Sequence, residues 1–449
     1  MKAYQSTIAG WGNYPKEEAV LYRPEKYQEL QEMITSKRHL HYISRGLGRS
    51  YGDTALNRGN GVLLHTQFHR FLAFDAETRI LECEAGVTLE EIIRVFLPRG
   101  YFLPVTPGTK YVTIGGAIAN DVHGKNHHKD GAISDHVIDF TLMTADGSVL
   151  TCSREENADL FWATVGGIGL TGILLTVRLR LIPVESAFID VDYQKAANLE
   201  EALEKLAETD ELYPYSVAWI DCLSSGKSMG RSVLMLGKHA SREHSLSVKE
   251  KRKLNMPFHL PSVALNPLSI GAFNTLYYNK FKDNSRVTVD YDTFFYPLDA
   301  IHNWNRMYGT SGFIQYQMVF PPETSKAGLT TILTMLSRSK KSSFLAVLKS
   351  FGQKGKGWLA FPRKGYTLAL DIPVRGGEKF FSFIQELDKA VMQYDGVLYL
   401  AKDSTMSPET FRHMYPEWEK FRQMKDQIDP NHVFSSSMSR RLKLTEDRG

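Results

Sequence analysis

Three glycine-rich segments in the first 172 residues constrain the fold of this chain most. They cover residues 45–53 (RGLGRSYGD), residues 107–124 and residues 166–172 (GGIGLTG). Glycine is needed where the backbone takes positive φ or approaches a ligand closely, and consecutive backbone N–H groups in such turns form an anion-binding concavity. One such loop is most often only a tight turn. Three together favour an extended, charged ligand such as a dinucleotide.

The third glycine segment carries the letters G-x-G-x-x-G of a Rossmann fingerprint at residues 167–172. A Rossmann loop follows a strand and opens a helix, so that the pyrophosphate lies at the helix N-terminus. Here the loop follows a predicted helix at 157–164 and opens a predicted strand at 173–181. The pattern therefore disfavours a nicotinamide-Rossmann domain, and no Walker loop occurs at the required spacing.

Histidines near the second glycine segment raise the question of a metal site. His123 and His127 have i, i+4 spacing, which brings two ligands together only on a helix. Gly124 and Asn126 disfavour a helix there, and no Glu follows His123. The prediction is that the site holds no metal and that these side chains, with Lys125, hydrogen-bond a polar ligand.

Composition and charge exclude several classes of protein. The 449 residues are enough for two or three domains, with 43% hydrophobic and 23% charged residues. A net charge of +4 is too small for a dedicated nucleic-acid binder.

Cys83, Cys152 and Cys222 form no C-x-x-C pair and are expected to be reduced core thiols. The first residues lack a signal-like apolar stretch and no window of roughly 18 apolar residues occurs, so a cytoplasmic, at most membrane-associated protein is predicted.

Hydrophobic periodicity predicts mixed helices and strands. The sequence pattern changes beyond Pro183, where a second domain is expected. Helices are predicted at 24–36, 157–164, 199–209 and 416–428, and a further helix is predicted from a Thr88/Glu91 capping box to about residue 98. Strands are predicted at 39–44, 62–65 and 173–181, with hairpin turns at 75–78 and 145–147. The segment 249–283 joins a basic run to apolar and aromatic residues. It suits either a mobile lid at a membrane or a long loop with a core helix.

The segments RGLGRSYGD (45–53), VTIGGAIA (112–119) and HGKNHH (123–128) together resemble the vanillyl-alcohol-oxidase-type family of flavoproteins, which carry a PCMH-type FAD-binding domain. The resemblance continues through residues 160–167, 294–299, 315–317 and 401–404, in the family's order and over nearly the whole chain. It implies an α+β, two-domain fold. An FAD-binding domain is expected at 1–186, a substrate domain with an antiparallel sheet at 187–396, and a C-terminal segment at 397–449 that returns to the FAD domain.

The resemblance also implies which residues hold FAD. By motif match these are Ser44, Arg45, Gly46, Leu47, Gly48, Arg49, Ser50, Tyr51, Gly52, Asp53, Gly108, Thr113, Ile114, Gly115, Gly116, Asn120, Asp121, Val122, His123, Ile173 and Tyr399. Some relatives attach the flavin covalently through a histidine in an R-x-x-G-H-S type loop. Here Arg49 stands before Ser50, so non-covalent FAD is expected.

The activity implied is an FAD-dependent oxidation of the 2-hydroxyl of a polyprenyl-phosphate-linked ribose to a keto sugar, by hydride transfer to flavin N5. This would be the first half of an epimerisation that supplies a cell-wall arabinan precursor, completed by a separate NAD(P)H-dependent reductase. The catalytic candidates are Lys402, Tyr51 and His123, and the substrate-binding candidates are Lys125, Tyr308, Gln315, Gln317 and Lys402.

Several alternatives stay open at the level of sequence. A desolvated Lys402 either acts as a base or stays charged and stabilises the developing alkoxide. A free alditol or aldonolactone is the alternative substrate, with oxygen as acceptor, and a non-catalytic sugar-binding protein is the alternative from another class. Ala369 stands where some members have a flavin-facing cysteine, which leaves the exact substrate open.

Overall fold

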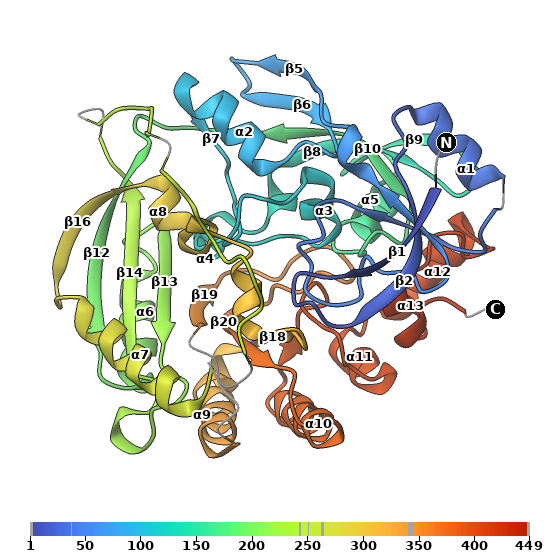
Figure 1. The fold of residues 1–449 in the computed structure, drawn as a ribbon. Coiled ribbons are helices and arrows are strands. Elements are labelled where there is room, and N and C mark those ends of the chain that lie inside the picture. Colours follow the sequence, from blue (N-terminus) through green and yellow to red (C-terminus); the bar gives the residue numbers. More distant parts are fainter. Residues whose placement is uncertain are drawn as a thin grey trace.

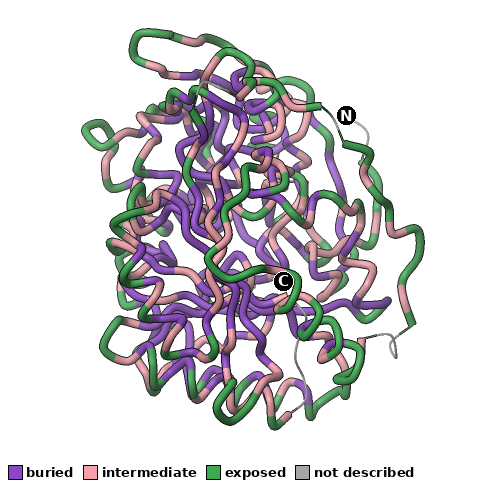
Figure 2. The backbone as a smooth tube through the Cα atoms, turned by 90° about the vertical axis from the view of Figure 1, so that its left-hand side faces the viewer, coloured by how far each residue is buried: buried purple, intermediate pink, exposed green. Residues whose placement is uncertain are grey.

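A computed structural model describes residues 3–36, 38–241, 244–249, 251–261, 265–339 and 345–446 of the chain. Figure 1 shows two groups of sheets, with the smaller sheets and both chain ends on one side and one large sheet on the other. Buried residues lie along the inside of both groups, and exposed ones follow the outer loops (Figure 2). The α+β class predicted from the sequence is confirmed.

The first part of the chain forms two sheets. A four-stranded sheet contains, in pairing order, β1 (Ala3–Ala9), β2 (Lys16–Tyr22), β4 (Gly61–Leu64) and β3 (Tyr42–Arg45). A five-stranded antiparallel sheet contains β5 (Phe71–Asp75), β6 (Ile80–Glu84), β10 (Ile173–Arg180), β8 (Val137–Met143) and β9 (Val149–Ser153). A short pair, β7 (Tyr101–Phe102) and β11 (Ile182–Pro183), lies beside them. The hairpins predicted at 75–78 and 145–147 are confirmed.

The large sheet is antiparallel throughout. Its eight strands pair in the order β16 (Ser285–Asp290), β12 (Phe188–Ala196), β14 (Ser232–His239), β13 (Tyr215–Ile220), β19 (Ala346–Phe351), β20 (Gly365–Pro373), β18 (Phe313–Phe320) and β21 (Val397–Leu398). A further parallel pair joins β15 (Leu254–Asn255) to β17 (Ile301–His302).

Helices complete both parts. They are α1 (Tyr27–Thr35), α2 (Leu89–Phe96), α3 (Ile114–Ala119), α4 (His127–Asp130), α5 (Ala158–Thr164), α6 (Leu199–Thr209), α7 (Pro267–Lys280), α8 (Tyr291–Phe295), α9 (Pro322–Ser339), α10 (Glu378–Gln393), α11 (Pro408–Met414), α12 (Trp418–Ile428) and α13 (Ser437–Arg441). The predicted capping box of α2 is present, with Thr88 and Glu91 bonding reciprocally. Helix α6 has the bounds predicted for it.

Two expectations about local structure need correction. The helix expected from residue 24 begins only at Tyr27, because Lys26 is extended and serves as its N-cap. The second glycine segment is partly helical rather than an open loop, since α3 spans its glycine pair. The Thr113 hydroxyl accepts the Gly116 N–H at 3.2 Å and caps this helix.

The two faces of the large sheet have different roles because side chains alternate along each strand. On β18, Tyr316 and Met318 point into a hydrophobic core shared with α6, α9 and α10. Gln315 and Gln317 point to the opposite face, which lines a cavity. The sheet therefore carries its core on one side and a polar surface on the other.

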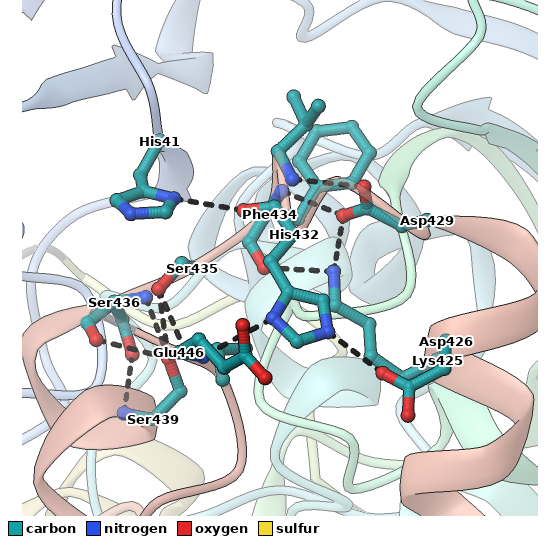
Figure 3. A network of polar contacts seen from close by, with 12 residues as sticks. His41, Lys425, Asp426, Asp429, His432, Phe434, Ser435, Ser436, Ser439 and Glu446 are labelled. Carbon is teal, nitrogen blue, oxygen red and sulfur yellow. Dashed lines mark hydrogen bonds and ion pairs between the residues drawn. The ribbon is translucent and has the colours of Figure 1, made fainter. Parts of the chain in front are cut away.

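After β21 the chain returns to the first part of the molecule. The Tyr42 N–H donates to the Val433 carbonyl at 2.6 Å, and the Ser435 N–H donates to the Tyr42 carbonyl at 3.0 Å. Figure 3 shows the buried polar network behind these contacts, in which the Asp429 carboxylate binds Lys425 Nζ. Residues 433–435 are thereby fixed against β3.

The three cysteines are free and buried, as the sequence predicts. Among the residues that the structure describes, no helix is both long and apolar enough to cross a bilayer.

Candidate active site

A cavity of about 590 Å³ lies between the glycine-rich segments and the polar face of the large sheet. Its first wall consists of residues 44–51, His65, residues 106–109 and most of residues 112–125. Its second wall consists of side chains from β12, β13, β14, β18, β19 and β20, with Gln315, Gln317 and Ala369 among them. A cavity of this size between two parts of a chain is typical of a ligand site.

Close backbone packing explains why the first loop is rich in glycine. A Cβ at Gly46 would lie 2.4 Å from the Thr113 hydroxyl, and a Cβ at Gly52 would lie 1.8 Å from the Asp403 carbonyl oxygen. Both distances are too short for any side chain. The loop therefore packs against the start of α3 at one point and against the C-terminal segment at another.

The first wall contains buried polar atoms that have no hydrogen-bond partner among the described residues. They are Ser44 Oγ, Arg49 Nε, Asn120 Oδ1, His123 Nδ1 and both ring nitrogens of His65. All five residues line the cavity. Buried polar atoms are normally satisfied, so these atoms fit a polar ligand that occupies this wall. The residues present therefore suit a dinucleotide such as FAD.

Most of the predicted cofactor residues line this wall, but not all. Those outside the lining are Gly52, Asp53, Ile114, Asp121 and Ile173. Asp53 has a structural partner instead, because its carboxylate accepts two hydrogen bonds from Arg441, at 2.8 and 2.9 Å. Burial raises the pKa of Asp121 to about 7.

Lys402 lies on the cavity side of the segment that follows β21. Its Nζ is 3.9 Å from the centre of the Tyr51 ring and donates to Gln315 Oε1. The side chain lines the cavity. Burial lowers the pKa of Lys402 to about 7, with Asp371 raising it and Lys349 lowering it further. A lysine in this setting exchanges its proton near neutral pH.

Tyr51 is held beside Lys402 by its own backbone, because its N–H donates to the Ala401 carbonyl at 2.9 Å. Burial raises the pKa of the Tyr51 hydroxyl well above its ordinary value. The phenol therefore stays protonated and remains a hydrogen-bond donor.

His123 occupies the opposite side of the glutamine pair. Gln317 Nε2 donates to His123 Nε2 at 3.0 Å. Burial holds the pKa of His123 well below its usual range, and nearby Lys349, His127 and Lys402 lower it further. The imidazole is therefore neutral and acts as a hydrogen-bonding group rather than a cation.

Two further lysines line the same cavity. Lys125 Nζ lies 4.1 Å from the Phe294 ring centre and donates to the Phe294 carbonyl. Lys349 projects from β19 into the same space. Burial lowers the pKa of Lys125 to about 7 and that of Lys349 to about 8. An anionic group bound here would favour the charged form of both side chains.

Tyr308 does not lie where its predicted role requires. It ends the short helix Trp304–Tyr308, its ring stacks on Phe313, and its hydroxyl donates to Asp371 Oδ2 at 2.9 Å. It is absent from the described cavity lining. Its contact with the site runs through Asp371.

Other residues that line the cavity were not predicted from the sequence as site residues. Trp11, which lies 3.9 Å from the Arg49 guanidinium, Asp299 and Lys349 all line the cavity. Lys349 and Val347 lie two residues apart on β19 and so share the strand face that lines the cavity. Trp11 precedes every motif, and only the fold brings it to the site.

The segment suggested as a lid is described in part, since residues 250 and 262–264 lie outside the described ranges. Within it, Tyr277, Lys280 and Phe281 line the cavity. On other sides of α7, Leu268 is 86% exposed and Leu276 is 73% exposed. Asn274 anchors the helix by donating to Asp221 Oδ1 at 2.7 Å.

The histidine cluster near residue 123 has no metal-binding geometry. His123 lies outside α4, which begins at His127, so their i, i+4 spacing does not fall on one helix. Across the described ranges, no three His, Cys, Asp or Glu side chains come together in a way that would hold a metal ion.

Two protein families match parts of this chain. The family described as "FAD binding domain" matches residues 19–153, which include the first wall of the cavity. The family described as "D-arabinono-1,4-lactone oxidase" matches residues 359–442, which include Lys402.

Individual proteins match over longer stretches. The chain is 38% identical over 413 residues to decaprenylphosphoryl-β-D-ribose oxidase of Mycolicibacterium smegmatis, covering 90% of this chain and 89% of that protein. It is 29% identical to mouse L-gulonolactone oxidase, over 45% of this chain and 46% of that one. It is 22% identical to L-gulono-1,4-lactone dehydrogenase of Mycobacterium tuberculosis, over 96% and 98% of the two chains. The chain therefore belongs to the decaprenylphosphoryl-β-D-ribose oxidase family of FAD-dependent oxidoreductases.

Proposed function

We propose that this protein oxidises the 2-hydroxyl of a polyprenyl-phosphate-linked ribose to a keto sugar. The observation that carries the proposal is the placement of Lys402, Gln315 and Gln317 together in the lining of the cavity, in a chain of this family. The relative from Mycolicibacterium smegmatis is named for a decaprenylphosphoryl ribose. The product is a precursor of cell-wall arabinan, once a separate NAD(P)H-dependent reductase completes the epimerisation.

FAD binds without a covalent link along the first wall of the cavity. Bound there, it supplies the hydride acceptor of the reaction. Ser44, Arg49, Asn120 and His65 offer it the buried polar atoms that otherwise lack partners. The backbone of residues 45–50 and 113–116 would hold its phosphates, since glycine turns present N–H groups to anions. No histidine occurs within residues 44–53 to form a flavin bond.

Lys402 accepts the proton of the sugar hydroxyl. With a pKa of about 7, a substantial fraction of this lysine is neutral at neutral pH, as a base requires. Gln315 Oε1 holds the ammonium form after proton transfer. Tyr51 covers the lysine from the side and limits its contact with water.

Gln317 and the neutral His123 orient the sugar from the opposite side. Correct orientation of the reacting carbon contributes more to the rate than any single contact, because hydride transfer needs the atoms about 3–3.5 Å apart. Lys125 and Lys349 bind the substrate phosphate as two cations without a carboxylate partner among the described contacts.

We assign the domains on the same basis. Residues 1–186 and 397–449 form the FAD-binding domain, and residues 187–396 form the substrate domain. The polyprenyl chain leaves the cavity along α7, whose exposed leucines and neighbouring lysines suit contact with an anionic membrane surface.

Product analysis tests this proposal. The purified holoenzyme is incubated with a polyprenyl-phosphoribose and an artificial electron acceptor, and the lipid-linked sugar is examined by mass spectrometry. The proposal predicts a product that has lost two hydrogen atoms from the ribose. An unchanged sugar together with turnover of free polyols would contradict it.

One observation favours a second candidate, the oxidation of an aldonolactone. The family named for D-arabinono-1,4-lactone oxidase covers residues 359–442, and two aldonolactone-oxidising relatives match the chain. These relatives are less similar than the ribose oxidase. Turnover of a free lactone at a rate equal to that of the lipid-linked sugar would favour this candidate.

A further inference from the structure

A buried carboxylate lies directly behind the residues assigned to proton transfer. Asp371 on β20 is the register partner of Gln315 on β18, and its side chain is fully buried. Gln315 Nε2 donates to Asp371 Oδ1 at 2.7 Å, and the Tyr308 hydroxyl donates to Asp371 Oδ2 at 2.9 Å. Both carboxylate oxygens are therefore occupied, and neither faces the cavity.

This arrangement fixes which way the Gln315 amide points. A carboxylate accepts hydrogen bonds, so it takes the amide nitrogen of Gln315. The amide oxygen is then left to accept from Lys402 Nζ on the other side. A carboxylate on one side and an ammonium on the other allow only one orientation of the amide between them.

We infer that Asp371 is a positioning residue that acts through Gln315 to hold Lys402 in its proton-accepting place. This inference rests on the role of Lys402 in the proposed function. Asp371 touches neither the cavity nor any reacting atom. It acts on Lys402 through the hydrogen bonds of Gln315 and through the negative charge of its carboxylate.

The electrostatics of the cluster agree with this role. Burial raises the pKa of Asp371 to about 7, while Gln315, Tyr308 and Lys402 lower it. Asp371 in turn raises the pKa of Lys402, and Lys349 on β19 opposes that effect. Tyr51 and the neutral His123 are titratable neighbours of the cluster from the first wall. The carboxylate therefore makes Lys402 a stronger base than burial alone would leave it.

The chain contains a matched control for this carboxylate. Asp388 on α10 is also buried, and it accepts from the Tyr316 hydroxyl at 2.6 Å. Burial raises its pKa to about 7 as well. Tyr316 lies on the helix-covered face of β18, opposite to Gln315. Asp388→Asn therefore removes a similar buried charge away from the cavity.

The first test needs no substrate. The visible spectrum of the oxidised, FAD-loaded protein is titrated with pH, since a cation beside the flavin changes its absorption. In Asp371→Asn, the transition assigned to Lys402 should move to lower pH by at least about one unit. In Asp388→Asn it should stay in place. A transition at the same pH in Asp371→Asn, or an equal shift in both variants, would overturn the inference.

The second test measures flavin reduction by polyprenyl-phosphoribose in an anaerobic stopped-flow instrument. Asp371→Asn should lower the limiting rate by roughly tenfold to a hundredfold, with little change in the substrate concentration at half-saturation, because the lysine is misplaced rather than the substrate. If even the unaltered enzyme does not react with this substrate, the proposed function fails and the spectral titration still decides the role of Asp371.

Tyr308→Phe provides a variant that keeps the carboxylate and removes one of its donors. A positioning role predicts a smaller shift of the spectral transition in the same direction as for Asp371→Asn. The opposite result would be a weaker apparent affinity for substrate, with the limiting rate and the spectral transition both unchanged. It would mean that Tyr308 contacts the substrate directly, and it would overturn the proposed chain of contacts.

Discussion

At the scale of single residues, the site depends on lysines placed where water is scarce. Lys402, Lys125 and Lys349 all have lowered pKa values, and burial is the first cause for each. Of the three, Lys402 alone is linked to a carboxylate in the described part of the chain, through Gln315. On this difference we propose Lys402 as the proton acceptor and the other two lysines as binding groups for an anion.

The first prediction concerns pH. Because Lys402 must be neutral to accept a proton, the rate of flavin reduction should rise about tenfold per pH unit below pH 7 and level off above about pH 8. Stopped-flow reduction between pH 5 and 9 measures this profile. A rate that falls above pH 7 would mean that the charged form of the lysine is the active one.

The second prediction concerns removal of the lysine. Lys402→Met should lower the rate of flavin reduction by about 10²–10⁴-fold, the range usual for loss of a general base, while FAD content stays the same. Lys420→Met serves as the control, since Lys420 is half exposed and pairs with Asp159 at 3.5 Å. Similar rates in the two variants would contradict the assignment.

At the scale of elements, the cavity is built by alternation on strands and by glycine in loops. The sequence places Gln315 and Gln317 two residues apart, and on β18 both point to the cavity face. It did not predict that α3 begins within the second glycine segment. A six-residue helix with two glycines has too little periodicity to stand out, and only the capping by Thr113 marks it.

The third prediction concerns α7. Replacing both exposed leucines in Leu268→Gln/Leu276→Gln should weaken binding to vesicles that contain anionic lipid and raise the KM for a long-chain substrate, because apolar contact with the membrane and lipid tail is lost. The FAD content should not change. Vesicle co-sedimentation measures the binding.

The matched control is Leu212→Gln, since Leu212 is 71% exposed but lies outside this segment. Equal losses of vesicle binding in the double variant and in the control would mean that α7 is not a membrane contact. Activity on a short-chain substrate should persist in both proteins.

At the scale of the whole molecule, the C-terminal segment holds the site together. It carries Lys402 and then packs on β3 through the network of Figure 3. Asp429 accepts from Lys425 and from the backbone N–H groups of Val433 and Phe434, both at 2.8 Å. Lys425 and Asp429 are completely buried.

The fourth prediction follows from this buried pair. Asp429→Ala leaves Lys425 without its carboxylate and should lower the free energy of unfolding by about 3–5 kcal/mol. Asp426→Ala should cost about 1 kcal/mol or less, because the Asp426 side chain is 46% exposed. Urea unfolding of the FAD-loaded proteins gives both values, and equal losses would contradict the prediction.

The fold class and many residues of the cavity wall could be predicted from the sequence, because short local motifs mark them. The glycine loops, the Gln315–Gln317 pair and Lys402 all lie in short recognisable stretches. Asp371 and Trp11 could not be found this way. Their place depends on strand register and on the packing of distant segments, which no local pattern records.

The central claim is that the chain carries a non-covalent flavin that a lipid-linked ribose reduces. The most direct test is the visible spectrum of the purified protein before and after acid precipitation, followed by anaerobic addition of a polyprenyl-phosphoribose to the native protein. We expect yellow flavin that is released by acid and bleached by this substrate. Flavin that stays on the precipitate, or that bleaches only with free polyols, would contradict it.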